Sequence, residues 1–382
     1  MNILIQDLRN NWENIKVLIF GLHMKYICLI FAFFYISLLV AQEDVKVEVK
    51  DSAAANEKSL FIEDYSNRLN IKFEVSNELK QYYFPFHDNI VKLAPNLGIR
   101  YALVFNYRFL SVRLGIRSKP SSASAKDKGE TDLFQLSVKL LFDKWAHSFE
   151  YVRVKGYYVK NTDDLDPILS DGDYHVQFPD LTTNVFSGTS AYKFNDKYSI
   201  KASQSQTEIQ LKSAGSFMPS IDYWFYVFNG ADNLINAGGE EIDRMNYSDF
   251  TGFSTVVNAG YYYTFVLKKW YANVYAAPGI GIDIFKQTFY SPDGSHQQNQ
   301  SDIVYSVQSG AGIGYNSDKY YFGVNYMNRF TDENRRESDF KFQTIKNSFF
   351  VFFGYRFKAP KTLSKPVDYI EKKVPILGDD KK

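Results

Sequence analysis

Cysteine is almost absent from this chain of 382 residues, which contains only Cys28. A single cysteine excludes an intramolecular disulfide, so packing and hydrogen bonding must hold the fold together. Histidine and tryptophan are also scarce, with five and four residues. The chain therefore offers few side chains for a metal centre or for imidazole-based catalysis.

The chain also has no excess of charge of either sign. The chain has 44 Lys and Arg residues against 43 Asp and Glu residues, for a net charge of +1. Nothing in this balance favours a nucleic acid or an acidic polymer as partner. After Ala41, no segment approaches the 18 consecutive apolar residues of a membrane-spanning helix, which excludes a helical membrane domain there.

Sequence motifs of common enzymes are missing too. There is no G-x-S-x-G, H-E-x-x-H, P-loop or Rossmann fingerprint. His147 and Ser148 are neighbours in sequence, so on a strand they point to opposite faces and cannot form a catalytic pair. Five aspartates lie within 161–173, but their spacing does not match a calcium loop. We expect no catalytic residue, no metal site and no cofactor.

An apolar segment near the N-terminus resembles a secretory signal. It runs from Tyr26 to Ala41, follows Lys25, and ends in a small residue suited to cleavage. With either Met1 or Met24 as the start, residues 1–41 are expected to be an upstream extension plus signal peptide. An uncleaved anchor is the alternative. The charged residues 42–67 are expected to form a flexible leader.

Aromatic residues, by contrast, are abundant, and they recur at alternate positions. Phe and Tyr number 33 and 29, and aromatic residues make up 17% of the chain. In a strand, alternate side chains share a face. The alternation predicts strands over 69–76, 97–105, 109–117, 132–142, 146–158, 184–194, 198–204, 214–228, 251–265, 270–285, 302–315, 319–330 and 345–357. Pro219 and Pro278 fall inside two of these strands, where irregular pairing is expected.

The lengths of the strands and of their connections predict a membrane barrel. A strand needs about 9–11 residues to cross a bilayer, and several of the predicted strands reach this length. Tight turns alternate with long polar connections over most of the chain, as in outer-membrane barrels. The predicted fold is all-β, a closed antiparallel transmembrane β-barrel over residues 68–357 with a basic periplasmic tail over 358–382. Thirteen candidates conflict with the even number of such barrels, so twelve or fourteen strands remain open.

If the apolar face of each strand meets lipid, charged residues line the interior. Lys72, Glu74 and Asp283 belong to this inward set. The predicted basic lining comprises Arg100, Arg113, Arg117, Lys139, Arg153, Lys155, Lys201, Arg329 and Arg356. Such a lumen could attract anionic solutes, although the favoured interpretation is that these side chains pair with one another, with loop carboxylates or with water and fill a narrow interior.

The last strand, FFVFFGYRF over 349–357, ends in an aromatic–x–aromatic pattern at Tyr355 and Phe357. This pattern resembles the signal that the outer-membrane barrel assembly machinery reads. The predicted partners are therefore this machinery and outer-membrane lipid, including lipopolysaccharide. The oligomeric state is left open.

Five stretches resemble an uncharacterised family of predicted outer-membrane barrels that carry a domain of unknown function. They are KGYYVKN (155–161), FPDL (178–181), KSAGSF (212–217), YYYTFVLKKWYANVYAAPGIG (261–281) and GIGYNSDKYYFG (312–323). The resemblance covers roughly 60–357. It implies strand and turn roles only and transfers no catalytic residue.

The expected protein is an outer-membrane barrel, without enzymatic activity, that serves structure, interaction or passive solute passage through a basic lumen. One alternative is a lipid-modifying barrel enzyme, which would need a serine, a histidine and an acid clustered at one rim. Another is a soluble lipocalin-like barrel that holds a ligand against an apolar interior.

Overall fold

The computed structural model describes residues 57–86, 89–117, 120–165, 167–243, 247–333 and 343–373. The predicted signal segment and most of the predicted leader lie outside these residues, as does the end of the tail. The barrel belongs to one compact unit, Asn56–Leu363, and Ser364–Lys382 belongs to another. Within the described residues, no helix is both long and apolar enough to cross a bilayer.

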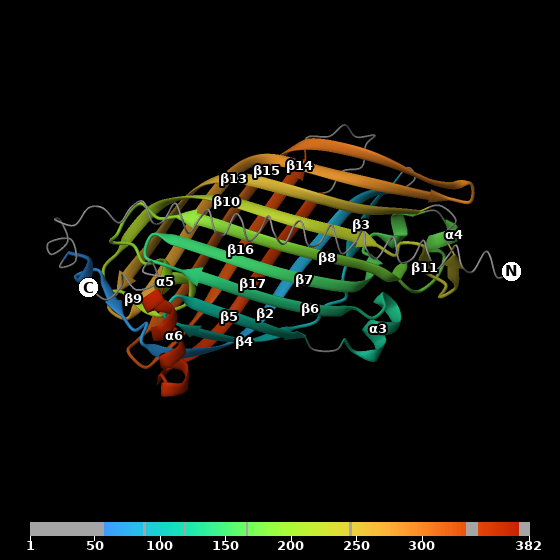
Figure 1. Ribbon diagram of the computed structural model, residues 1–382. Helices are drawn as coiled ribbons and strands as arrows, with labels where there is room; N and C mark the ends of the chain where they lie inside the picture. Colours follow the sequence, from blue (N-terminus) through green and yellow to red (C-terminus); the bar gives the residue numbers. More distant parts are fainter. Residues whose placement is uncertain are drawn as a thin grey trace. The chain divides into compact units, whose positions relative to one another are not determined.

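Twelve antiparallel strands form the closed wall of the barrel (Figure 1). They are β2 (Arg68–Phe86), β4 (Arg100–Tyr107), β5 (Leu110–Arg117), β6 (Asp132–Leu141), β7 (Trp145–Val159), β8 (Gln177–Tyr192), β10 (Ala214–Asn229), β13 (Tyr247–Leu267), β14 (Trp270–Ser291), β15 (Gly294–Asn316), β16 (Tyr320–Glu333) and β17 (Gln343–Lys358). The last strand pairs with the first, from Gln343 opposite Tyr83 to Lys358 opposite Arg68. This seam leaves no free edge in the wall, as a bilayer requires.

Shorter elements lie in the connections. The strands are β1 (Ile62–Asp64), β3 (Asn89–Ala94), β9 (Glu208–Gln210), β11 (Asn233–Ile235) and β12 (Glu241–Asp243). The helices are α3 (Ser122–Lys128), η2 (Thr162–Asp164), α4 (Pro167–Ser170), α5 (Ile200–Gln204) and α6 (Lys361–Lys373).

The structure resolves the conflict over strand number. The predicted strand over 198–204 was wrong: this segment contains α5, and the Ser199 side chain caps it by accepting a hydrogen bond from the Ala202 amide. The remaining twelve candidates all belong to wall strands. The predicted leader is also not wholly flexible, because β1 pairs with β9 from Ile62 opposite Gln210 to Asp64 opposite Glu208.

The two ends of the barrel differ in their connections. Residues 108–109, 142–144, 268–269 and 317–319 make tight turns at one end, which we call the inner end because outer-membrane barrels have short periplasmic turns. The long connections gather at the other end, the outer end. One inner connection, 193–213, is long, and it carries α5 and β9.

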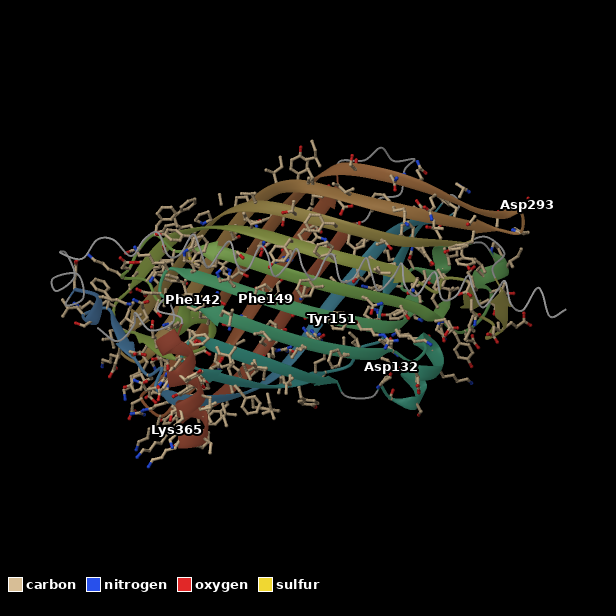
Figure 2. The ribbon with its side chains drawn as sticks, in the orientation of Figure 1. Asp132, Phe142, Phe149, Tyr151, Asp293 and Lys365 are labelled. Atoms are coloured by element: carbon tan, nitrogen blue, oxygen red, sulfur yellow. The ribbon has the colours of Figure 1, made fainter. Side chains whose placement is uncertain are left out.

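The wall is apolar outside and largely polar inside. Large apolar side chains on its outer face are exposed, among them Phe73, Leu103, Val257, Ile313 and Phe353. Aromatic rings collect at the inner end, where Trp145 packs against Tyr192 with ring centroids 5.0 Å apart. Figure 2 shows Phe142 near the inner end and Asp132 near the outer end, with Phe149 and Tyr151 between them. This is the arrangement of a lipid-facing band with an interfacial aromatic girdle.

Tyrosines fill the interior by lying over glycines on the neighbouring strand. Four cross-strand pairs share this arrangement: Tyr226 and Gly252, Tyr271 and Gly314, Tyr275 and Gly310, and Tyr321 and Gly354. In each pair, a Cβ added to the glycine would collide with the tyrosine ring. The glycine run at 310–314 therefore provides space for aromatic rings.

The two prolines sit where a missing N–H costs little. Pro219 pairs with β13, but the ladder to β8 begins only at Ser220. Pro278 stays in the ladder to β15, whereas the ladder between β13 and β14 is interrupted from Asn258 opposite Gly279 to Tyr261 opposite Ala276. Each proline is thus paired with a neighbouring strand on one side only, as expected of proline in a sheet.

Gly310→Ala is expected to destabilise the barrel by about 1–3 kcal/mol, because the added methyl must displace the Tyr275 ring or the strand. Gly115→Ala is the matched control on the inner face, since its Cβ would lie in ordinary contact, 3.5 Å from Arg113 Nη1. Urea unfolding in lipid vesicles measures both variants. Equal stability of the two variants would contradict the role of the Tyr–Gly pairs.

Candidate functional site in the barrel interior

Ion pairs occupy the middle of the interior near the seam. Lys72 Nζ lies 2.9 Å from Glu74 Oε1, and Arg113 Nε donates to Glu74 Oε2 at 2.8 Å. All three side chains are largely buried. The Glu74 carboxylate thus neutralises part of the charge of two cations predicted to point inward.

A second group of charges continues toward the outer end. Arg100 donates to Glu78, and Lys346 Nζ lies 3.4 Å from the other oxygen of that carboxylate. Lys346 also lies 3.6 Å from Glu150, which accepts a hydrogen bond from Gln135 at 3.0 Å. The cations in this group are again matched by carboxylates.

A third network surrounds Asp222 on β10. Its carboxylate accepts hydrogen bonds from Thr189 at 2.6 Å and from Asn258 at 3.1 Å, and Gln308 donates to it as well. Arg329 Nη2 lies 3.4 Å from Asp222 Oδ2. The carboxylate is 2% exposed, so its charge is balanced from within the barrel.

A segment that we call the inner plug, residues 193–212, folds into the inner end. Arg356 on β17 anchors it by donating from Nε to the Gln206 carbonyl at 3.0 Å. Its guanidinium also lies 5.0 Å from the ring centroids of both Tyr65 and Tyr321. A further bond reaches Asn316 Oδ1 at 2.7 Å. Arg356 thereby joins the leader, the plug and the wall.

Other wall residues support the inner plug. Asn70 donates to the carbonyl of Ser205 at 2.8 Å, and Lys139 donates to the Gln204 side chain at 3.2 Å. Tyr198 and Ile200 of the plug join an apolar cluster with wall residues. The plug is therefore held by both polar and apolar contacts.

A buried ion pair lies inside the plug. Lys201 Nζ is 3.6 Å from Glu208 Oε1, and Ser199 Oγ donates to the same carboxylate at 2.5 Å. Burial raises the pKa of Glu208 above its usual value, against the opposing effects of the Lys201 charge and the Ser199 hydrogen bond. Removing either partner would leave a buried charge uncompensated.

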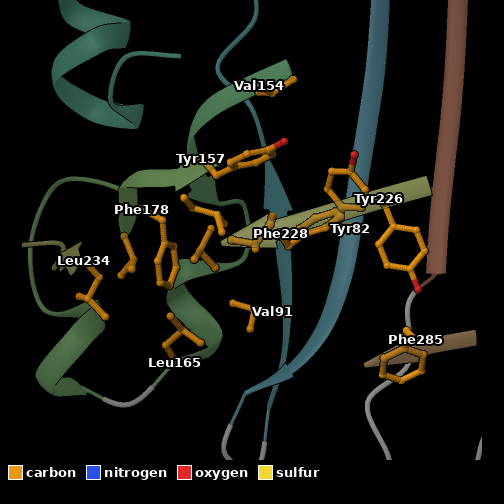
Figure 3. Close-up of a cluster of buried hydrophobic side chains, with 14 residues drawn as sticks. Tyr82, Val91, Val154, Tyr157, Leu165, Phe178, Tyr226, Phe228, Leu234 and Phe285 are labelled. Carbon is orange, nitrogen blue, oxygen red and sulfur yellow. The ribbon is translucent and has the colours of Figure 1, made fainter. Parts of the chain in front are cut away.

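An apolar cluster closes the outer end (Figure 3). Wall residues and residues from the outer connections contribute to it. Its buried members are Tyr82, Val91, Leu93, Val154, Tyr157, Val159, Leu165, Val176, Phe178, Leu181, Tyr226, Phe228, Leu234 and Phe285. β3 supports this closure by pairing with β7 at Leu93 opposite Val159, beyond the ends of β5 and β6. The interior is thus filled at both ends.

The structure separates the predicted basic lining into several groups. Arg100, Arg113, Lys139, Arg329 and Arg356 lie on the inner face of wall strands. Lys201 lies in the inner plug and not on a strand. Arg117 ends β5, and its side chain lies outside the described part of the structure.

The inward positions predicted for Arg153 and Lys155 were wrong. Arg153 lies opposite Phe134, whose ring is exposed on the outer face, and Arg153 is itself exposed. Lys155 is 43% exposed and pairs with Asp180 at 2.9 Å. The reason is that Val154 faces the apolar outer cluster, so the apolar residues of β7 do not all face lipid.

Sequence reasoning also missed three interior carboxylates, Glu78, Glu150 and Asp222. Glu78 lies just beyond the predicted end of its strand. Glu150 shares the inner face with Val154, so the same reversed alternation hid it. Asp222 could have been found from the sequence, because Ser220 and Asp222 are polar residues at alternate positions and so share one face of the predicted strand. With these acids included, the interior is not a basic surface.

A serine and a histidine do meet at the inner end. His147 Nδ1 and Ser190 Oγ are 2.9 Å apart, and Trp145 stacks parallel to the imidazole. Both side chains are at most 9% exposed, and no carboxylate contacts His147 among the described residues. The described residues also contain no group of three His, Cys, Asp or Glu side chains that could hold a metal ion.

Tyr355 and Phe357 lie on the outer face of β17. Both rings are exposed, and their centroids are 4.7 Å apart. Arg356 between them points inward to the plug.

Replacing Arg356 with Met is expected to release the inner plug, because the carbonyl of Gln206 and the Asn316 side chain lose their donor. Amide hydrogen exchange over 199–210 should accelerate at least tenfold, as expected for a loss of about 1.5–3 kcal/mol per charged hydrogen bond. Lys358→Met, an exposed cation on the same strand, is the control. Unchanged exchange in the Arg356 variant would show that the plug is held without it.

The solved structures that resemble this chain are outer-membrane barrels. No curated protein matches it. Among solved structures, it is similar to the outer membrane protease OmpT from Escherichia coli, with 10% identity, 77% of this chain and 98% of that chain covered, and a TM-score of 0.33. It is also similar to the translocator domain of the autotransporter NalP from Neisseria meningitidis, with 11% identity, coverage of 85% and 99%, and a TM-score of 0.32.

These similarities are too distant to transfer any activity. The closed wall, its apolar outer face and its aromatic girdle are those of a protein of the cell outer membrane. The model of a family described as a domain of unknown function, DUF4421, matches residues 51–357. The chain belongs to this family of outer-membrane barrel proteins.

Proposed function

We propose that this protein is a closed barrel that serves structure or interaction at the cell surface and does not conduct solutes passively. The observation that carries this proposal is the filling of the interior at both ends, by the inner plug and by the outer apolar cluster. The outer cluster also anchors the connections that carry η2, α4 and β11, through Leu165 and Leu234. These folded connections would be the surface available to partners.

Two other functions receive less support. Passive passage of anions would need unpaired cations, whereas Arg100, Arg113 and Arg329 contact carboxylates. A lipid-modifying enzyme would need an accessible nucleophile and an acid, whereas Ser190 and His147 are shielded and no carboxylate of the described ranges contacts His147. We therefore do not assign an enzymatic role.

The proposed closure is tested by conductance and by thiol labelling. The purified barrel in planar lipid bilayers should give no steady conductance. Met327 points inward opposite Gly310, and its side chain is 46% exposed to the interior. A bulky, membrane-impermeant maleimide should label Met327→Cys at least tenfold more slowly than Gln297→Cys, which lies on the exposed outer part of β15.

This comparison is clean because Cys28, the only native cysteine, lies in the segment expected to be removed. Steady conductance together with fast labelling of Met327→Cys would refute the closed barrel and revive solute passage.

We also propose that the assembly machinery recognises Tyr355 and Phe357. Their outward exposure supports this role. Replacing both with Ala should lower the amount of heat-modifiable barrel in the outer membrane severalfold. Phe349→Ala, which removes an exposed ring from the same face of the same strand, should have a smaller effect. Equal losses in the two variants would mean that only the apolar area matters.

A further inference from the structure

The outer face of β6, β7 and β8 changes from apolar to polar toward the outer end, and on β7 this change occurs between Tyr151 and Arg153. Phe134 and Tyr151 are exposed on this face, with ring centroids 6.1 Å apart. The next residue of β7 on the same face is Arg153, which lies between Phe134 of β6 and Asn184 of β8. Arg153 therefore marks the outer boundary of the apolar band on these strands.

The height of Arg153 fits this assignment. It lies eight residues along β7 from Trp145, which belongs to the aromatic girdle of the inner end. At about 3.3 Å per residue and a tilt of about 40°, this is about 20 Å along the membrane normal. The apolar band of such barrels is about 25 Å tall, so the Arg153 backbone lies about 5 Å below its outer edge, a gap that the long arginine side chain can span to reach the headgroups.

The neighbours of Arg153 leave its charge uncompensated. Within the described residues, no hydrogen bond or ion pair involves its guanidinium. The Asp180 carboxylate pairs with Lys155 at 2.9 Å, and Asp132 lies opposite Lys155 in the ladder, one position beyond Arg153 on the same face. An arginine at this boundary without a protein partner is suited to an anion supplied by the membrane.

Asn184 supplies a second donor beside this guanidinium. Tyr151 donates its hydroxyl hydrogen to Asn184 Oδ1 at 3.0 Å, which orients the amide. The amide nitrogen of Asn184 then points away from Tyr151 and is available to donate. A guanidinium and an amide N–H2 on adjacent strands provide several donors for the oxygens of one phosphate.

We propose that Arg153 and Asn184 bind the phosphate of an anionic lipid headgroup in the outer leaflet. The Phe134 and Tyr151 rings just below them would contact the first part of its acyl chains. This site lies on the lipid-facing wall, so the proposal is independent of whether the interior conducts.

Native mass spectrometry of the barrel with phosphatidylglycerol tests this site. The expected result is that Arg153→Gln weakens binding of the first phosphatidylglycerol about fivefold, as one basic residue near a membrane surface contributes about 1 kcal/mol. Lys286→Gln is the control, because Lys286 is an exposed cation on the outer face of β14, sixteen residues along the strand from Trp270 at the inner end. Retained heat-modifiability would show that both variants are folded.

Three outcomes would overturn the proposal. The first is unchanged phosphatidylglycerol binding in Arg153→Gln. The second is an equal loss in Lys286→Gln, which would indicate general charge attraction. The third concerns the source of the phosphate: if inorganic phosphate competes with phosphatidylglycerol at millimolar concentration, the site binds a free anion and not a membrane lipid.

Discussion

The seam between β17 and β2 is the constraint on which the rest of this structure depends. In a bilayer, an unpaired strand edge leaves backbone donors and acceptors without water, so the first and last strands must pair along their length. The residues of β17 also provide an apolar surface toward lipid and contacts that fill the interior. Its outer face carries exposed rings, among them Phe353 and Phe357, and its inner face carries Gly354 and Arg356. Gly354 accepts the Tyr321 ring, and Arg356 holds the inner plug. Closing the wall and closing the inner end therefore use the same strand.

A twelve-stranded wall encloses more space than its own inward side chains can fill. Other parts of the chain must therefore fill the rest of the interior. This chain fills the space in three different ways. Tyrosine rings lie over glycines of the next strand, carboxylates pair with the inward cations, and the connections fold inward at both ends. Lys72, Arg100, Arg113 and Arg329 each lie within 4 Å of a carboxylate, so much of the interior charge is balanced, as low-dielectric surroundings require. A balanced and occupied interior supports closure more directly than any single contact.

The sequence was sufficient to predict the barrel, its membrane and most wall strands, because a period of two persists wherever one face meets lipid. It was insufficient where that contrast disappears. Val152 and Val154 face an apolar cluster inside the barrel, so β7 is apolar on both faces and its alternation was assigned in reverse. Arg153 was thereby placed inside and Glu150 was missed. The strand predicted over 198–204 failed for another reason: Tyr198 and Ile200 of the plug pack against wall residues, and the Ser199 cap favours a short helix there.

The reversed assignment of β7 changes what its basic residues can do. An arginine inside the barrel competes for carboxylates that other cations already occupy, and it adds to a charge that the closed interior must neutralise. An arginine on the outer wall can instead contact anionic lipid headgroups, because these surround the barrel at the outer edge of the apolar band. The position of Arg153 beside Phe134 and Tyr151 places its charge where the apolar band ends. Arg153 is therefore presented on the membrane-facing wall, whereas Arg100, Arg113 and Arg329 are held inside the barrel by carboxylates.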